Sequence, residues 1–243
     1  MGHSFLESAF IMKFYRLIPF ALLAVPALGH SILFTKTIAF VDPDGLYTYA
    51  GQVDFSQSGT TLKVLFTNIA PNAVTKQRRV LNSVFFDLAG NPTLTSGAAT
   101  IAAGSTQING GDAPANIGAH WAFKQGLSSN QWGNAKYGIS SVGLGVFGPG
   151  DTFPPGGGSV NGVDYGLVSA AGTTLGTPFV KDTMQFTFTL PVGYTLTANG
   201  VSNVWFQYGS DQSEYFFNVP EPATMGALGI GALALIARKR RKN

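Results

Sequence analysis

The feature that most constrains the fold of this 243-residue chain is a set of short segments in which every second side chain is apolar. In residues 184–190 the apolar positions alternate with Gln and Thr, so an extended segment would have one apolar and one polar face. Gly, Pro, Asn and Asp interrupt these segments, as they do at turns. The pattern predicts half-buried β-strands in residues 31–41, 47–55, 62–66, 80–88, 139–147, 165–170, 184–190 and 201–208.

Helical periodicity is scarce in the same part of the chain. Between residues 30 and 219 only residues 113–123 suggest a short helical turn. Many short strands without alternating helices predict an all-β fold, an antiparallel β-sandwich or jelly roll, flanked by an N-terminal signal helix and a C-terminal hydrophobic helix. No internal repeat points to a propeller or solenoid. We therefore expect a single domain over residues 30–219, with a long exposed loop at the Gly-rich residues 148–162.

The N-terminal region has the three parts of a secretory signal peptide. Lys13 and Arg16 provide the charged part, residues 17–26 the apolar part, and Ala27 and Gly29 a small-x-small cleavage site. The apolar part is shorter than the roughly 20 residues needed to span a bilayer. We expect signal peptidase to remove residues 1–29, which would include a spurious extension before Met12. The alternative is a buried N-terminal helix.

The C-terminal region has three different parts in a fixed order. Pro220, Glu221 and Pro222 come first, and their prolines keep the backbone extended and outside any helix. Residues 223–237 are apolar or small, and a helix of that length would enter a bilayer. A basic cluster then favours the cytoplasmic side of the membrane and consists of Arg238, Lys239, Arg240, Arg241 and Lys242.

This order, spacing and terminal position resemble the PEP-CTERM sorting signal of Gram-negative bacteria, which would occupy residues 220–243. The resemblance implies recognition by exosortase, a membrane cysteine transpeptidase, and an inner-membrane intermediate on the way to the cell surface or extracellular matrix. Such proteins are often found in producers of exopolysaccharide and biofilm. A permanent transmembrane anchor is the alternative. Residues 137–216 also resemble uncharacterised exosortase-dependent surface proteins, through Tyr137-Gly138-Ile139-Ser140 and Phe206-Gln207-Tyr208-Gly209.

The basic balance of the whole chain comes from its two ends. Of the 15 Lys and Arg residues seven lie outside residues 30–219, and of the 12 Asp and Glu residues two do, which leaves 8 basic and 10 acidic residues. A domain with a net charge of about −2 has no nucleic-acid footprint. The basic residues Lys76, Arg78 and Arg79 are expected to lie in a solvated loop.

The residue types that support most cofactor and metal chemistry are rare. The chain has no cysteine, which excludes disulfides, thiolate metal sites and cysteine nucleophiles. Apart from His30 at its first position, the predicted domain has one histidine, His120. No Gly-x-Ser-x-Gly motif accompanies it, so we expect it to be structural. Asp42 and Asp44 are interpreted as turn residues rather than calcium ligands. No metal or cofactor is predicted.

Two further groups of residues could carry a function. A carboxylate pair for glycoside hydrolysis would have to come from Asp151, Asp164, Asp182, Asp211 and Glu214. Sugar-stacking aromatic rings would come from Trp121, Trp132, Tyr137, Trp205 and Tyr208, although filling the core is the stronger interpretation.

The sequence thus predicts an exported surface or matrix protein with a structural, adhesive or polysaccharide-associated role and no catalytic activity. A secreted carbohydrate-active enzyme, using Asp164 and Glu214, is the alternative. An ice-binding surface is a lower alternative, suggested by threonines such as Thr187 and Thr189 on one strand face.

Overall fold

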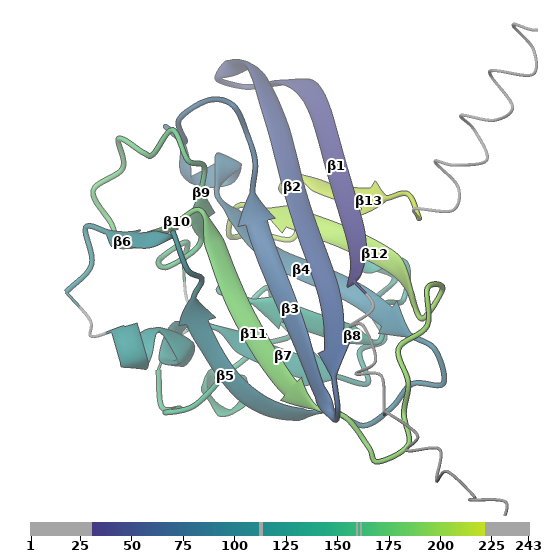
Figure 1. Ribbon diagram of the computed structural model, residues 1–243. Coiled ribbons are helices and arrows are strands. Elements are labelled where there is room, and N and C mark those ends of the chain that lie inside the picture. The colour runs from purple at the N-terminus through teal and green to yellow at the C-terminus, as the bar shows by residue number, and fades with distance from the viewer. Residues whose placement is uncertain (1–30, 112–113, 159, 161, 222–243) are drawn as a thin grey trace, which may run out of the picture.

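The computed structural model describes residues 31–111, 114–158, 160 and 162–221 and shows two β-sheets packed face to face (Figure 1). The first sheet has the strand order β1-β2-β3-β11-β5. All its strand pairs are antiparallel. Its strands are β1 (Ser31–Asp42), β2 (Gly45–Ser58), β3 (Thr61–Asn68), β11 (Thr183–Thr189) and β5 (Thr95–Ile101).

The second sheet has the strand order β13-β12-β4-β9-β10-β6, and β8 pairs with both β4 and β7. β9 and β10 run parallel, so this sheet is not purely antiparallel as we had expected. Its strands are β13 (Phe216–Val219), β12 (Val201–Tyr208), β4 (Leu81–Leu88), β9 (Leu167–Val168), β10 (Phe179–Lys181), β6 (Thr106–Ile108), β8 (Tyr137–Ser140) and β7 (Ala122–Gln125).

The core between the sheets is built mainly from alternating side chains of the long strands. Phe186 of β11, for example, is fully buried and contacts the ring of Trp121, with the centroids 5.0 Å apart. The two sheets approach closely at Gly51 of β2, where an added Cβ would lie 2.8 Å from the Phe206 ring of β12. Burial of these apolar side chains drives the folding of the sandwich.

The all-β sandwich prediction is confirmed in its main features. The alternation correctly located β11 and β12, and residues 113–123 contain the 3₁₀ helix η2 (Pro114–His120). Two predicted strands were too long, because the chain is extended only in β8 and in β9 within residues 139–147 and 165–170. Past Ser140 the chain turns, with positive φ angles of 47° at Leu144 and 68° at Gly145.

The Gly-rich residues 148–162 are not a wholly exposed loop. Their described part begins with η4 (Pro149–Asp151), and the ring of Phe153 is fully buried. Phe153 lies 5.4 Å from Phe186 and 5.6 Å from Phe188 between ring centroids. Phe153 therefore fixes this loop to the core. The prediction of an exposed loop was wrong here because it rested on the Gly and Pro content and overlooked this one aromatic residue.

Candidate functional site

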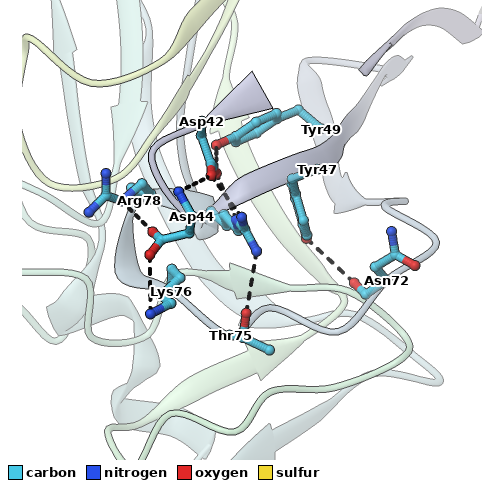
Figure 2. Close-up of polar contacts among 9 residues, drawn as sticks. Asp42, Asp44, Tyr47, Tyr49, Asn72, Thr75, Lys76 and Arg78 are labelled. Atoms are coloured by element: carbon cyan, nitrogen blue, oxygen red, sulfur yellow. Dashed lines mark hydrogen bonds and ion pairs between the residues drawn. The ribbon is translucent and has the colours of Figure 1, made fainter. Parts of the chain in front are cut away.

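The turn between β1 and β2 is fixed to the rest of the domain by a buried ion pair (Figure 2). Asp42 ends β1, and Arg79 ends the 3₁₀ helix η1 (Gln77–Arg79). Arg79 donates from Nε to Asp42 Oδ2 at 2.7 Å and from Nη2 to Oδ1 at 2.8 Å. The side chains are 0% exposed for Asp42 and 9% exposed for Arg79. This bidentate geometry is the strong form of an Arg–carboxylate contact.

Further contacts use the remaining acceptor positions of Asp42. The Tyr49 hydroxyl donates to Oδ2 at 2.9 Å, and the Asp44 backbone N–H donates to Oδ1 at 2.8 Å. The Arg79 guanidinium lies 4.5 Å above the centre of the Tyr47 ring, a cation–π contact. We call Asp42, Asp44, Tyr47, Tyr49 and Arg79 the corner. Each oxygen of Asp42 accepts two hydrogen bonds, so this carboxylate is committed to structure.

The titration of the corner follows from these contacts. The hydrogen bonds from Arg79 are the main cause that lowers the pKa of Asp42 to about 2, although burial acts in the opposite direction. The same contact raises the pKa of Arg79 above its ordinary value. Burial raises the pKa of Tyr47 to about 12. Asp42 and Arg79 are therefore charged and Tyr47 neutral at every physiological pH.

The structure corrects our interpretation of the basic cluster at residues 76–79. Arg79 is buried rather than solvated, while Lys76 and Arg78 pair with Asp44 at 3.2 Å and 3.3 Å. Asp44 therefore links the turn between β1 and β2 to the segment that carries Lys76 and Arg78. Among the residues that the structure describes, no group of three or more His, Asp or Glu residues could hold a metal ion.

Of the aromatic residues that we considered for sugar stacking, Trp205 is half-buried and the other four lie in the core. Trp121, Trp132 and Tyr137 are 0%, 1% and 2% exposed. Trp132 stacks on Phe85 at 3.9 Å and donates from Nε1 to Gln207 Oε1 at 3.0 Å. Because none of the three offers an open ring face, they form no exposed stacking surface in this fold.

Most of the candidate carboxylates make local turn contacts. Glu214 Oε2 accepts hydrogen bonds from the backbone N–H groups of Ser210 and Asp211 at 2.5 Å and 3.0 Å. Asp211 accepts from the Ser213 backbone at 2.7 Å, and hydrogen bonds from Ser213 lower the pKa of Asp211. These contacts fit the turn role of Asp and Glu. The lack of catalytic activity stays a prediction.

Two more carboxylates are held by neighbouring side chains. Asp182 Oδ1 accepts from the hydroxyls of Ser105 and Thr183 at 2.9 Å and 2.8 Å. Asp151 Oδ2 accepts from the Gly148 N–H at 2.9 Å and lies 3.5 Å from Lys124 Nζ. Both contacts order local loops. His120 stacks on Tyr165, with the ring centroids 3.8 Å apart.

The described chain ends at the beginning of the predicted sorting segment. β13 is an edge strand that pairs only with β12 in its sheet, with Val219 opposite Val204 and Asn218 opposite Trp205. Val219 is 2% exposed, Pro220 is half-buried and Glu221 is exposed. A hollow of about 580 Å³ borders this exit and is lined by Ser202, Asn203, Asn218, Val219, Pro220 and Glu221. The Pro-Glu-Pro sequence thus follows the last strand without a linker.

The remaining sorting predictions lie outside the described residues. These are the cleavage site at Ala27 and Gly29, the residue Pro222, the two predicted terminal helices and the basic cluster from Arg238 to Lys242. Within the described part of the chain, no helix is both long and apolar enough to cross a membrane.

Residues 218–242 match the family model of the PEP-CTERM protein-sorting motif. Neither the curated proteins nor the solved structures contain a match to this chain. The motif supports the resemblance found in the sequence and implies processing by exosortase. It also implies export to the cell surface via the membrane.

Proposed function

We propose that this chain, which carries a PEP-CTERM protein-sorting motif, places its β-sandwich at the cell surface or in the extracellular matrix for a structural or adhesive role without catalysis. The observation that carries the proposal is the direct junction between β13 and the motif. Residues 218–242 match the motif, and residues 216–219 are the last strand of the folded domain. The sandwich is therefore the cargo of the sorting signal.

The junction has a physical consequence for sorting. A protease binds its substrate as an extended segment, often by pairing with its backbone. Val219 is buried and paired with β12, so the chain on the N-terminal side of Pro220 is not free for such pairing while β13 is in place. Because β13 is a four-residue edge strand, it can detach from β12 at a lower cost than a central strand. We expect sorting to proceed through this detachment.

A structural or adhesive role agrees with the chemistry of the described residues. The buried ion pair and the turn carboxylates serve the fold, as described above. The linings of two hollows, of about 440 Å³ and 370 Å³, contain no Asp, Glu or His. In the part of the chain that the structure describes, no particular contact favours the carbohydrate-active alternative, which needs two carboxylates across a cleft.

The proposal is tested by replacing Pro220, Glu221 and Pro222 with alanine and measuring the protein in surface, membrane and medium fractions of its host. A matched control replaces three exposed loop residues, Thr195, Thr197 and Asn199, with alanine. The motif variant should accumulate in the inner membrane, and the control should reach the surface as the wild type does. Equal surface amounts of motif variant and wild type would contradict the sorting role.

A further inference from the structure

The exposed aromatic side chains of the described residues lie close to the last strand. The two most exposed phenylalanines of this part of the chain, Phe40 and Phe216, are 41% and 37% exposed. Phe216 begins β13, and the Phe40 ring of β1 lies 5.2 Å from the ring of the preceding residue, Tyr215. The half-buried ring of Trp205 in β12 lies 6.0 Å from that of Phe216. β1 and β13 are edge strands that lie next to each other in the sandwich (Figure 1), and we call Phe40, Trp205 and Phe216 the exit rim.

Trp205 is held in a way that suits a less polar environment than water. Its Nε1 donates to Asn203 Oδ1 at 2.8 Å. The Asn203 amide is fixed in turn, because its Nδ2 donates to Asp87 Oδ2 at 3.0 Å and to the Gly133 carbonyl at 2.9 Å. The indole N–H therefore needs no water, and moving the ring out of water leaves no donor unpaired. Such a ring suits the region between water and hydrocarbon at a membrane surface.

The length of chain after β13 limits how far the sandwich can lie from a membrane that holds the tail. Residues 223–237 are apolar or small, and the four Cα–Cα steps from Val219 to Ala223 span at most about 14 Å. The polar region of a bilayer is about 6 Å deep on each side of the hydrocarbon core. Trp205 lies opposite Asn218, one residue before Val219. With the apolar residues in a bilayer, the end of β13 and Trp205 beside it are therefore close to the lipid head groups.

We propose that the exit rim docks on the lipid head groups of the membrane that holds the tail. Aromatic rings at a bilayer surface place apolar area toward the hydrocarbon while polar atoms stay among the head groups. The rim has no charged side chain, and the exposed Glu221 at the exit does not attract anionic lipid, so neutral lipid is sufficient. This inference rests on the proposed function, because it requires the tail to enter the membrane. It adds that docking keeps β13 at the bilayer, where the sorting enzyme acts.

The test uses Trp205 as a fluorescent probe in the full chain, reconstituted into phosphatidylcholine vesicles with and without bromine on the acyl chains near the head groups. Bromine quenches only tryptophans that touch lipid. The other two tryptophans of the chain, Trp121 and Trp132, are 0% and 1% exposed, so they should not respond. Trp205→Phe removes the probe and keeps an aromatic ring. Flotation of the vesicles shows separately whether the tail is inserted.

A pair of variants tests whether the rim itself docks. Phe216→Ser removes an exposed aromatic ring from the rim. Val192→Ser is the matched control, because Val192 is 94% exposed and lies in the loop after β11, whose Leu190 N–H donates to the Thr60 carbonyl in the turn between β2 and β3. That turn is at the opposite end of β2 from the turn to β1. Thermal unfolding in detergent checks that all three variants keep the fold.

We expect brominated lipid to quench the wild type and Val192→Ser equally and to leave Trp205→Phe unquenched. In Phe216→Ser the ratio of quenched to unquenched Trp205 should fall about fivefold, because less apolar area leaves water on docking.

The proposal is overturned if the inserted wild type is not quenched, if Trp205→Phe is quenched as strongly as the wild type, or if Phe216→Ser is quenched like Val192→Ser. Protection of Trp205 from aqueous iodide without quenching by lipid would also overturn it, because a second copy would then cover the rim. A chain that does not float with the vesicles contradicts tail insertion and with it both proposals. A chain that floats without quenching overturns only the docking and leaves the proposed function intact.

Discussion

The corner and β13 hold two parts of the sandwich in opposite ways. At the corner, a bidentate ion pair between Asp42 and Arg79 is buried and surrounded by two tyrosine rings. At β13, four residues pair with a single strand, and the chain leaves for the sorting motif directly after Val219. The difference suggests a division of roles. An ion pair fixes the N-terminal hairpin, whereas backbone pairing and aromatic contacts, among them Phe217 against the corner residue Tyr49 at 5.7 Å, hold the strand that the proposed sorting step would open.

The strongest test of this difference locks β13 to β12 with a disulfide. The chain has no cysteine, so Val204→Cys with Val219→Cys introduces one defined bond between directly opposite residues. If cleavage depends on the detached state, the oxidised variant should be processed at least about tenfold more slowly in membranes that contain the sorting enzyme. A reductant should restore processing, which intact-mass spectrometry would follow.

The control places a disulfide in the fixed hairpin. Thr35→Cys with Gln52→Cys joins opposite residues of β1 and β2. This pair should leave processing unchanged in both redox states. Equal processing of the oxidised β13 variant and the wild type would show that β13 stays in place during sorting.

A second test removes one partner of the buried ion pair. Arg79→Met leaves the Asp42 carboxylate buried without its cation, so the free energy of unfolding should fall by about 3 kcal/mol. Arg78→Met is the matched control, because Arg78 pairs with Asp44 at a more exposed site, and there the loss should be within about 0.5 kcal/mol. Urea unfolding of the two variants gives both values. Similar losses would mean that the corner is not a special fixation point.

The corner also shows where sequence reasoning stops. Alternation located β11 and β12, because the residues of these strands that point into the core are apolar and are separated by more polar residues. β5 was missed, because Thr95–Ile101 consists largely of small and hydroxyl residues without a clear alternation. The acidic turn and the basic cluster were each noted, but nothing in the sequence joins residues 37 positions apart. Tyr47 and Tyr49 were a usable signal, since inward tyrosines next to an acidic turn favour a buried polar contact.

For the candidate site, too, the sequence revealed linear motifs but not contacts between residues far apart in the chain. The terminal motif could be identified from residue order alone, because sorting signals are linear. Neighbours across the first sheet could not, since they depend on the register of four strands, which the sequence does not state. The aromatic residues Trp121 and Trp132 were the more visible sugar-binding candidates, and the fold uses them in its core.

A third prediction concerns pH. The pKa of Asp42 is about 2 in the folded protein, below its ordinary value of 3.8. A lowered folded-state pKa adds stability that is fully present above the ordinary value and is lost as pH falls through the folded value. The corner should therefore contribute about 2 kcal/mol that disappears between about pH 4 and pH 2. In Asp42→Asn, urea unfolding should lose that part of the pH dependence; an unchanged profile would contradict the assignment.

The smallest effect is expected at β13. Asn218 Nδ2 donates to the Val204 carbonyl at 3.3 Å, at the long end of hydrogen-bond distances. Asn218→Ala should lower the stability of the domain by about 0.5 kcal/mol and raise the rate of processing by no more than about threefold. A large loss of stability would show that β13 is held as firmly as the corner.

Intact-mass spectrometry of the protein in surface, membrane and medium fractions of its host tests the central claim most directly. The account predicts a surface form that begins near residue 30, retains the sandwich and lacks the segment after the Pro-Glu-Pro motif. Thr35→Ala and the loop control, which lie in the cargo domain, should give the same processed ends. A mature form that is found in the membrane fraction and still carries its basic C-terminus would contradict the account, because the tail would then be a permanent anchor.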